Sequence, residues 1–405
     1  MTIGVGGSTF EAELARMKPM AEGAVPISTA ELEQRLAKAQ RLMREQGIQA
    51  LYLDTSTNLR YFTGIELKLT ERLHGAIIPA EGEIAYLSPN FEEPKTRTLL
   101  RTGADIRVWE EHEDPTNLVI ETVRSKGYDS GTLAIDPATP FYTVDGMRKA
   151  GNSFTFANAA SITGACRMVK SPAEIALMQI AMNITLEVHK VVARCLAPGM
   201  TTTDVKGFLD AAHRRLGGLG AGGAVQFGEA TAYPHGVPYP QTLVEGDMVL
   251  VDTGCFVHGY RSDITRTYVF GGPTPRQREI WNLEQRAQQA GFDAAILGAP
   301  CEAVDAAARG AIAAGGFGPD YATPGLPHRT GHGIGLDVHE ESFMVRGNKT
   351  PLVPGMCFSD EPTICIYGEF GIRLEDCIYM TEQGARWFTQ PSHSVDDPFG
   401  YEVIV

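Results

Sequence analysis

The chain has 405 residues, of which 43% are hydrophobic and 21% are charged, so it can form two domains that each bury a core. Its 35 lysines and arginines against 49 aspartates and glutamates give a formal net charge of −14. Nucleic acid and anionic membranes are therefore poor partners, because both require clustered cations. A surplus of carboxylates instead favours the binding of divalent metal ions.

The seven cysteines are odd in number and include no C-x-x-C pair, which is typical of a reduced cytoplasmic protein. Charged side chains such as Glu11, Arg16 and Lys18 interrupt the start of the chain, so no signal peptide is expected there. We find no run of about 18 apolar residues and therefore expect no membrane span.

The first part of the chain alternates predicted strands and helices. Residues 1–27 lack a hydrophobic period and are expected to form a loosely held N-terminal arm. Ser28 and Glu31 form a capping box that predicts a helix ending at Gly47. Further elements are predicted as a strand at 48–54, a hairpin at 76–87, a helix at 115–126 and a strand at 132–136.

The small polar residues 158–163 predict a linker, which gives an N-terminal domain over 28–162 and a C-terminal domain over 163–405. Ser171, Pro172 and Glu174 then stand in the preferred order for a helix start. Helices are predicted at 171–196, 201–216, 275–297 and 301–314, and strands at 248–251, 265–270, 356–359, 363–366 and 377–380. The order of elements favours an α+β fold with a sizeable sheet over a doubly wound parallel one.

Two local motifs suggest functions that their context does not support. Residues 218–223 match G-x-G-x-x-G, but a helix precedes them where a dinucleotide site needs a strand, so we interpret them as a flexible loop. Asp252-Thr-Gly254 follows an apolar strand as in an aspartic protease, and Asp129-Ser-Gly131 offers a partner. Asp129, however, lies in a predicted turn after Gly127.

A stronger set of metal-ligating residue types is spread over the last 155 residues or so. Asp252 and Asp263 flank a predicted hairpin, which would bring both carboxylates together. His332 lies in a Gly-His-Gly segment, Glu361 precedes a proline at a strand edge, and Glu375 follows fourteen residues later. Four carboxylates and one imidazole suit two Mn²⁺, Co²⁺ or Zn²⁺ ions, because bridging carboxylates screen the repulsion between the cations.

The order of these five residues resembles the pita-bread metallopeptidases, which include methionine aminopeptidase, aminopeptidase P and prolidase. The surrounding motifs match as well: 251–254, 262–263, 331–335, 338–340, 360–362 and 373–376. The resemblance covers roughly residues 165–405. It implies a pita-bread C-terminal catalytic domain, preceded by the smaller α/β N-terminal domain of the creatinase and prolidase type, which methionine aminopeptidases lack.

The resemblance also implies a role for each residue. Asp263 and Glu375 would bridge two divalent ions, Mn²⁺ being the first choice and Co²⁺ or Zn²⁺ the alternatives. Asp252 would bind one ion, and His332 with Glu361 would complete the other.

Four residues would then act on the substrate or support the site. Glu361 would carry a proton to the leaving nitrogen, and His339 would hydrogen-bond the oxyanion. His235 matches a second substrate histidine, and Arg373 matches an arginine that supports the metal carboxylates.

Binding of a dipeptide carboxylate calls for a cation near His339. Prolidases carry an arginine shortly after this histidine, whereas four residues beyond His339 this chain has Phe343. Either Arg346 takes that role through a longer loop, or the carboxylate is bound in another way.

These features favour a cytoplasmic Xaa-Pro dipeptidase that acts on small proline-containing peptides. The resemblance to the family implies that it forms a homodimer. The alternatives are an aminopeptidase P that acts on longer peptides, a metal-free creatinase-like hydrolase, and a non-catalytic binding module. All five metal ligands are present, which favours a metal-dependent enzyme over the last two.

Overall fold

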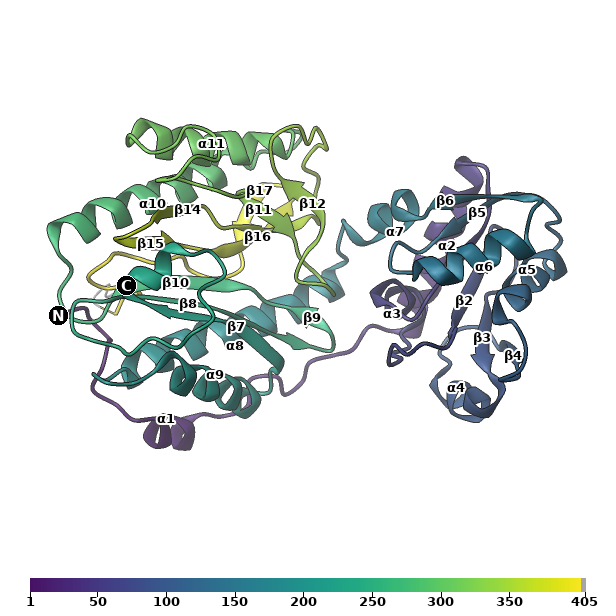
Figure 1. Cartoon of the computed structure of the whole chain (residues 1–405), viewed down its shortest axis with the longest axis horizontal. Coiled ribbons are helices and arrows are strands. Elements are labelled where there is room, and N and C mark those ends of the chain that lie inside the picture. The colour runs from purple at the N-terminus through teal and green to yellow at the C-terminus, as the bar shows by residue number, and fades with distance from the viewer. Residues whose placement is uncertain (402–405) are drawn as a thin grey trace. The chain divides into compact units, whose positions relative to one another are not determined.

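The computed structural model describes residues 1–401, which form two compact units (Figure 1). The smaller unit is Ile27–Arg167, and the larger unit combines Met1–Pro26 with the chain from Met168 onward. The boundary at residue 167 differs from the predicted one at 162, because Ala160–Arg167 forms helix α7, which packs on α2 within the smaller unit. The last four residues of the domain predicted over 163–405 lie outside the described residues.

The N-terminal segment is an ordered part of the larger unit and not the loosely held arm that its composition predicted. Helix α1 (Phe10–Arg16) packs on α8 and α9, with the ring of Phe10 stacked 4.2 Å from that of Phe208. Buried Glu13 forms an ion pair of 2.8 Å with Arg194. These contacts join residues almost 200 positions apart, so no local hydrophobic pattern in the sequence predicts them.

The smaller unit is an α/β domain around one sheet of six strands in the order β4-β3-β2-β1-β5-β6. The pairs β1–β5, β5–β6 and β3–β4 are parallel, and β1–β2 and β2–β3 are antiparallel. The hairpin predicted at 76–87 is confirmed as β2–β3. The strands of the smaller unit are β1 (Ile48–Leu53), β2 (Gly75–Pro79), β3 (Ala85–Pro89), β4 (Asp105–Trp109), β5 (Gly131–Ile135) and β6 (Phe154–Asn158). Its helices are α2 (Thr29–Glu45), α3 (Thr57–Thr63), α4 (Glu93–Leu99), α5 (Pro115–Ser125), α6 (Phe141–Ala150) and α7, with the 3₁₀ turn η1 (Asn90–Glu92).

The larger unit is an α+β domain built on antiparallel strands. One sheet has the order β10-β8-β7 with β9 paired to β8, a second has the order β12-β11-β13-β16-β17, and β14 pairs with β15. Helices α8 and α9 pack on β8 and β7, whereas α10 packs on β13–β15 and α11 on β12 (Figure 1).

The helices of this unit are α8 (Pro172–Cys195), α9 (Thr202–Leu216), α10 (Pro275–Ala294) and α11 (Glu302–Ala314), with the 3₁₀ turn η2 (Gly228–Ala232). The strands are β7 (Leu219–Phe227), β8 (Met248–Val257), β9 (Tyr260–Arg261), β10 (Ile264–Val269), β11 (Gly331–Gly333), β12 (Glu340–Met344), β13 (Cys357–Asp360), β14 (Thr363–Ile366), β15 (Phe370–Arg373), β16 (Asp376–Thr381) and β17 (Gly384–Trp387).

Helix α8 buries many of its residues in the larger unit, and the capping box predicted at Ser171 and Glu174 is confirmed. Its length and hydropathy also meet the criteria for a membrane span, unlike those of any other helix in residues 1–401. More than half of its most apolar 18-residue window is buried in the protein, where it packs against β8 and β9. The packed core therefore accounts for its apolar residues.

The glycine-rich segment interpreted as a flexible loop is strand β7, paired with β8. At Gly223, where φ is +139°, an added Cβ would lie 1.9 Å from the Asp252 carbonyl oxygen. Glycine is normally unfavourable in a strand, but here it permits a close backbone approach. The segment is therefore one wall of the site described next.

Candidate active site

A cavity of about 740 Å³ opens in the larger unit between its two main sheets. Its walls include all five residues predicted as metal ligands: Asp252, Asp263, His332, Glu361 and Glu375. Glycines of β7 line another part of the wall. The structure thus brings together side chains that are up to 123 positions apart in the sequence.

Strand pairing explains how the first sheet positions its acids. Asp252 lies on β8 directly opposite Thr265 of β10, and Thr265 in turn forms a backbone bridge with Glu375. Asp263 immediately precedes β10. Because Asp252, Asp263 and Glu375 lie on or next to paired strands, their carboxylates face the same cavity.

The second sheet supplies the nitrogen ligand and the remaining acid. His332 lies on β11, and Glu361 directly follows β13, the next strand in that sheet. The Oγ of Ser359 accepts a hydrogen bond of 3.0 Å from the His332 amide and donates one of 3.2 Å to Glu361. Ser359 therefore fixes the spacing between the two ligands.

The potential ligand atoms lie at metal-binding separations. One ligand atom each from Asp263, His332 and Glu375 lies within 4.8 Å of the others. The Nε2 atom of His332 is 3.1 Å from Glu361 Oε1 and 3.8 Å from Asp263 Oδ2. One cation between these atoms would contact oxygen and nitrogen ligands from both sheets.

The acids strongly perturb one another. Burial raises the pKa of Asp263 well above its usual value, and the nearby Asp252 raises it further. Burial followed by the charge of Asp263 does the same to the pKa of Glu375. Burial would also raise the pKa of Glu361, but the hydrogen bond and charge of His332 lower it to about 2. Without a bound cation, the raised pKa values favour the protonated forms of Asp263 and Glu375, whereas the lowered pKa favours the ionised form of Glu361.

The residues fit a divalent metal centre on three grounds. The cluster concentrates negative charge in a buried site, which is costly without a compensating cation. The Oε1 atom of Glu375 is buried and has no hydrogen-bond partner among residues 1–401. Finally, four carboxylates and one imidazole form a donor set for Mn²⁺, Co²⁺ or Zn²⁺.

Arg373 lies against the acids of the cavity. Its Nη2 lies 2.6 Å from Asp252 Oδ2, and its Nε donates to Thr265 Oγ1 at 3.1 Å. Thr265 Oγ1 also donates to Glu375 Oε2 at 2.6 Å. Thr265 thus connects the arginine to a second metal-site acid, a role that sequence reasoning missed.

The aspartic-protease alternative required Asp129 as the partner of Asp252. Asp252 instead pairs with Arg373, and Asp129 is an exposed turn residue of the smaller unit.

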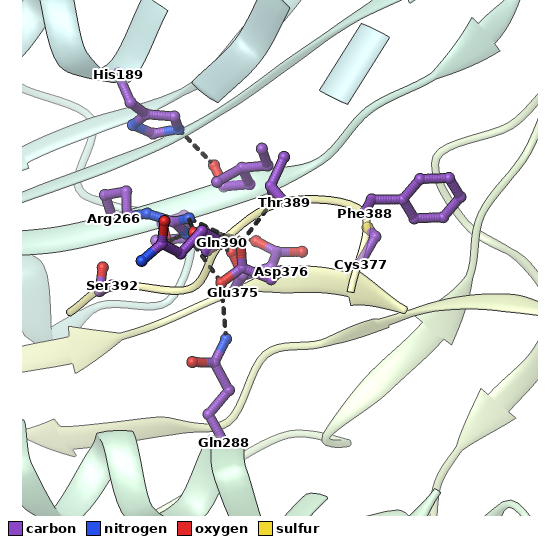
Figure 2. Close-up of polar contacts among 12 residues, drawn as sticks. His189, Arg266, Gln288, Glu375, Asp376, Cys377, Phe388, Thr389, Gln390 and Ser392 are labelled. Atoms are coloured by element: carbon purple, nitrogen blue, oxygen red, sulfur yellow. Dashed lines mark hydrogen bonds and ion pairs between the residues drawn. The ribbon is translucent and has the colours of Figure 1, made fainter. Parts of the chain in front are cut away.

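A buried ion pair anchors the strands beneath the acids (Figure 2). Arg266 of β10 forms two hydrogen bonds with Asp376 of β16, of 2.7 and 3.1 Å, and donates to the Glu375 carbonyl at 2.9 Å. Gln288 and Thr389 complete the hydrogen bonds of the Asp376 carboxylate. Both charged side chains are at most 1% exposed, so the pair locks β10 and β16 in register.

Asp376→Ala is expected to lower the free energy of unfolding by about 3–5 kcal/mol, because it leaves the buried Arg266 charge uncompensated. Chemical denaturation of the metal-free protein measures this loss. The control is Asp210→Ala in the exposed Arg214–Asp210 pair of α9, which should cost no more than about 1 kcal/mol. Equal losses in the two variants would contradict the anchoring role.

Three histidines other than His332 line the cavity. The ring of His339 meets that of His332 edge to face, 4.1 Å apart, and burial followed by the charge of His332 lowers the pKa of His339. His235 is exposed at the rim, in the turn after η2. His328, which the sequence analysis missed, contacts Thr363 at 3.1 Å and has a pKa lowered by burial. Its position four residues before His332 was the available signal.

The structure does not bring Arg346 to the cavity. Its side chain is 57% exposed and forms an ion pair with Asp320, which corrects the expected placement. Arg346 lies beyond the end of β12, so its side chain follows the surface loop. The cavity instead contains Arg329, three residues before His332, and Arg261 of β9.

Comparison with known proteins gives matches over both units. The model of metallopeptidase family M24 matches residues 176–382, and that of the creatinase/prolidase N-terminal domain matches 35–169. The putative dipeptidase YkvY of Bacillus subtilis is 30% identical over 359 residues, covering 88% of this chain and 97% of the relative. An Xaa-Pro dipeptidase of Lactobacillus helveticus is 32% identical over 363 residues, covering 87% and 96%. The crystal structure of dipeptidase PepE from Mycobacterium ulcerans aligns with a TM-score of 0.85 at 34% identity, covering 92% of this chain and 99% of that chain.

Proposed function

Because this chain belongs to metallopeptidase family M24, we propose that it is an Xaa-Pro dipeptidase that hydrolyses dipeptides ending in proline with two divalent metal ions. The larger unit has the pita-bread catalytic fold of this family, and the smaller unit is a creatinase/prolidase N-terminal domain. The observation that carries the proposal is the convergence of Asp252, Asp263, His332, Glu361 and Glu375 on one cavity. The relatives named as dipeptidases support the choice of substrate.

Five side chains would hold the two ions in this proposal. Asp263 and Glu375 would help to hold both ions, Asp252 would help to hold one of them, and His332 with Glu361 would help to hold the other. When bound, the ions would lower the pKa of a water molecule and polarise the scissile carbonyl. The donor set accepts Mn²⁺, Co²⁺ or Zn²⁺, and we propose Mn²⁺ as the first choice.

The chain's own residues then handle protons and substrate. The proline nitrogen of an Xaa-Pro bond carries no hydrogen and must gain a proton before it can leave. Glu361 takes a proton from the attacking water and delivers it to that nitrogen. His339, whose lowered pKa keeps it neutral near pH 7, donates an N–H to the oxygen on which charge develops. His235 contacts the substrate at the rim, and Arg373 holds Asp252 in place.

Peptide length tests the assignment, since aminopeptidase P would use the same metal residues on longer substrates. We expect Ala-Pro to be hydrolysed and Ala-Pro-Ala to be a poor substrate, measured by release of free alanine at fixed Mn²⁺. Val-Ala serves as the control peptide without proline. Cleavage of Ala-Pro-Ala alone would replace the dipeptidase assignment with an aminopeptidase.

A further inference from the structure

We propose that Arg329 binds the C-terminal carboxylate of the dipeptide and thereby sets the length of the substrate. This inference rests on the proposed dipeptidase function and names the residue that makes the enzyme a dipeptidase. A dipeptide differs from a longer peptide in the carboxylate that follows its proline. A cation in the cavity that holds the metal ligands would recognise this group by its charge.

Three arginines line that cavity, and their contacts distinguish them. Arg373 is already paired with Asp252 and also donates to the Pro234 carbonyl at 3.0 Å. Arg261 lies opposite Phe256 and donates through Nε to the Leu336 carbonyl at 3.3 Å. The Arg329 guanidinium has no ion pair and no hydrogen bond with any residue in 1–401. Its donors therefore remain available for a ligand.

Stacking on an aromatic ring fixes where the free guanidinium lies. The Arg329 guanidinium carbon is 4.3 Å from the centre of the Phe343 ring. Phe343 of β12 stands directly opposite His332 of β11 in the antiparallel pair, and opposed residues project from the same face of a sheet. Phe343 thus holds the guanidinium on the face of the sheet that presents the metal ligand His332.

This position matches the shape of an Xaa-Pro dipeptide. Only the proline α-carbon separates the scissile nitrogen from the carboxylate, so the carboxylate must bind close to the metal ligands. The guanidinium is planar and can donate two parallel N–H bonds to a carboxylate. Stacking on Phe343 occupies one face of that plane but leaves the N–H groups at its edge free. An amide or a further residue after proline would place no negative charge there.

The test compares Ala-Pro with Ala-Pro-amide, which lacks only the carboxylate charge. Losing a charge-assisted hydrogen bond typically reduces affinity by about 10- to 100-fold, so Arg329→Met should raise KM for Ala-Pro by about that factor. Hydrolysis of Ala-Pro-amide should be unchanged within about twofold, because that substrate never used the charge. The KM of Arg329→Lys for Ala-Pro should lie between those of the wild type and Arg329→Met, since a lysine keeps the charge and loses the paired geometry. A comparison of inhibition by proline with inhibition by prolinamide measures the same effect without turnover.

Two other arginines provide matched controls. Arg346→Met, on the surface, should leave both substrates unaffected. Arg261→Met, in the cavity, should not change the ratio of the two substrates. The inference is overturned if Arg329→Met affects both substrates equally or neither, or if the selective loss appears in Arg261→Met. A wild-type enzyme that does not prefer Ala-Pro to its amide would instead overturn the dipeptidase proposal itself, and the inference with it.

Discussion

Asp263→Asn is expected to lower kcat/KM by about 10³-fold or more and, at the same time, to raise the melting temperature of the metal-free protein. The loss follows from the position of Asp263 between both halves of the ligand set, within reach of His332 and Glu375. A metal ion contributes several kcal/mol of charge stabilisation to the transition state, and each 1.4 kcal/mol is tenfold in rate.

The gain in stability has an electrostatic cause. Burial and the charge of Asp252 both raise the pKa of Asp263, so above its usual pKa this group destabilises the folded, metal-free protein relative to the unfolded chain. Above its usual pKa the unfolded chain releases this proton freely, whereas the folded chain does not, so the penalty grows with pH. Asparagine removes the penalty, and the gain in melting temperature should therefore be larger at pH 8 than at pH 5.

Three measurements check this pair of effects: dipeptide hydrolysis, bound metal per chain, and thermal unfolding after chelation. Asp293→Asn, at an exposed position on α10, is the matched control and should change none of them. A fully active Asp263→Asn enzyme would show that the cluster is not the catalytic centre. A lower melting temperature of the metal-free variant would contradict the electrostatic account.

His339→Ala is expected to lower kcat by about 10²- to 10³-fold, the usual cost of removing one oxyanion donor. The ring of His339 lies 4.1 Å from that of His332, so its N–H can reach a substrate oxygen held at the metal site. His339 is not one of the proposed ligands, and bound metal should therefore equal that of the wild type. The effect should appear in kcat more than in KM, because charge on the oxygen develops only in the transition state.

Steady-state kinetics with Ala-Pro and metal analysis of the same samples test this prediction. His339→Gln should recover part of the rate, since its amide can donate a hydrogen bond from nearly the same place. His112→Ala, at an exposed position in the smaller unit, should behave as the wild type. Loss of bound metal in His339→Ala would make this histidine a ligand and not an oxyanion donor.

The sequence predicted most of the site because its chemistry lies in short motifs. The residues around Asp252, His332 and Glu375 form local patterns that can be recognised without knowledge of the fold. The helix starting at Ser171 was predictable for the same reason, since its cap, proline and glutamate are neighbours in the chain.

The features that could not be predicted depend on contacts between distant residues. The N-terminal segment is held by contacts with Arg194 and Phe208. The glycine-rich strand β7 forms because its glycines permit a close approach to the backbone of Asp252. Arg346 was expected to reach the substrate because it follows His339 in sequence. The stacking of Arg329 on Phe343 joins the segment before β11 to β12 and leaves no local pattern.

Metal content measured together with activity tests the central claim most directly. We expect about two divalent ions per active chain, loss of Ala-Pro hydrolysis when a chelator removes them, and recovery as Mn²⁺ is added back. Full hydrolysis of Ala-Pro by protein shown to be free of metal would contradict the account.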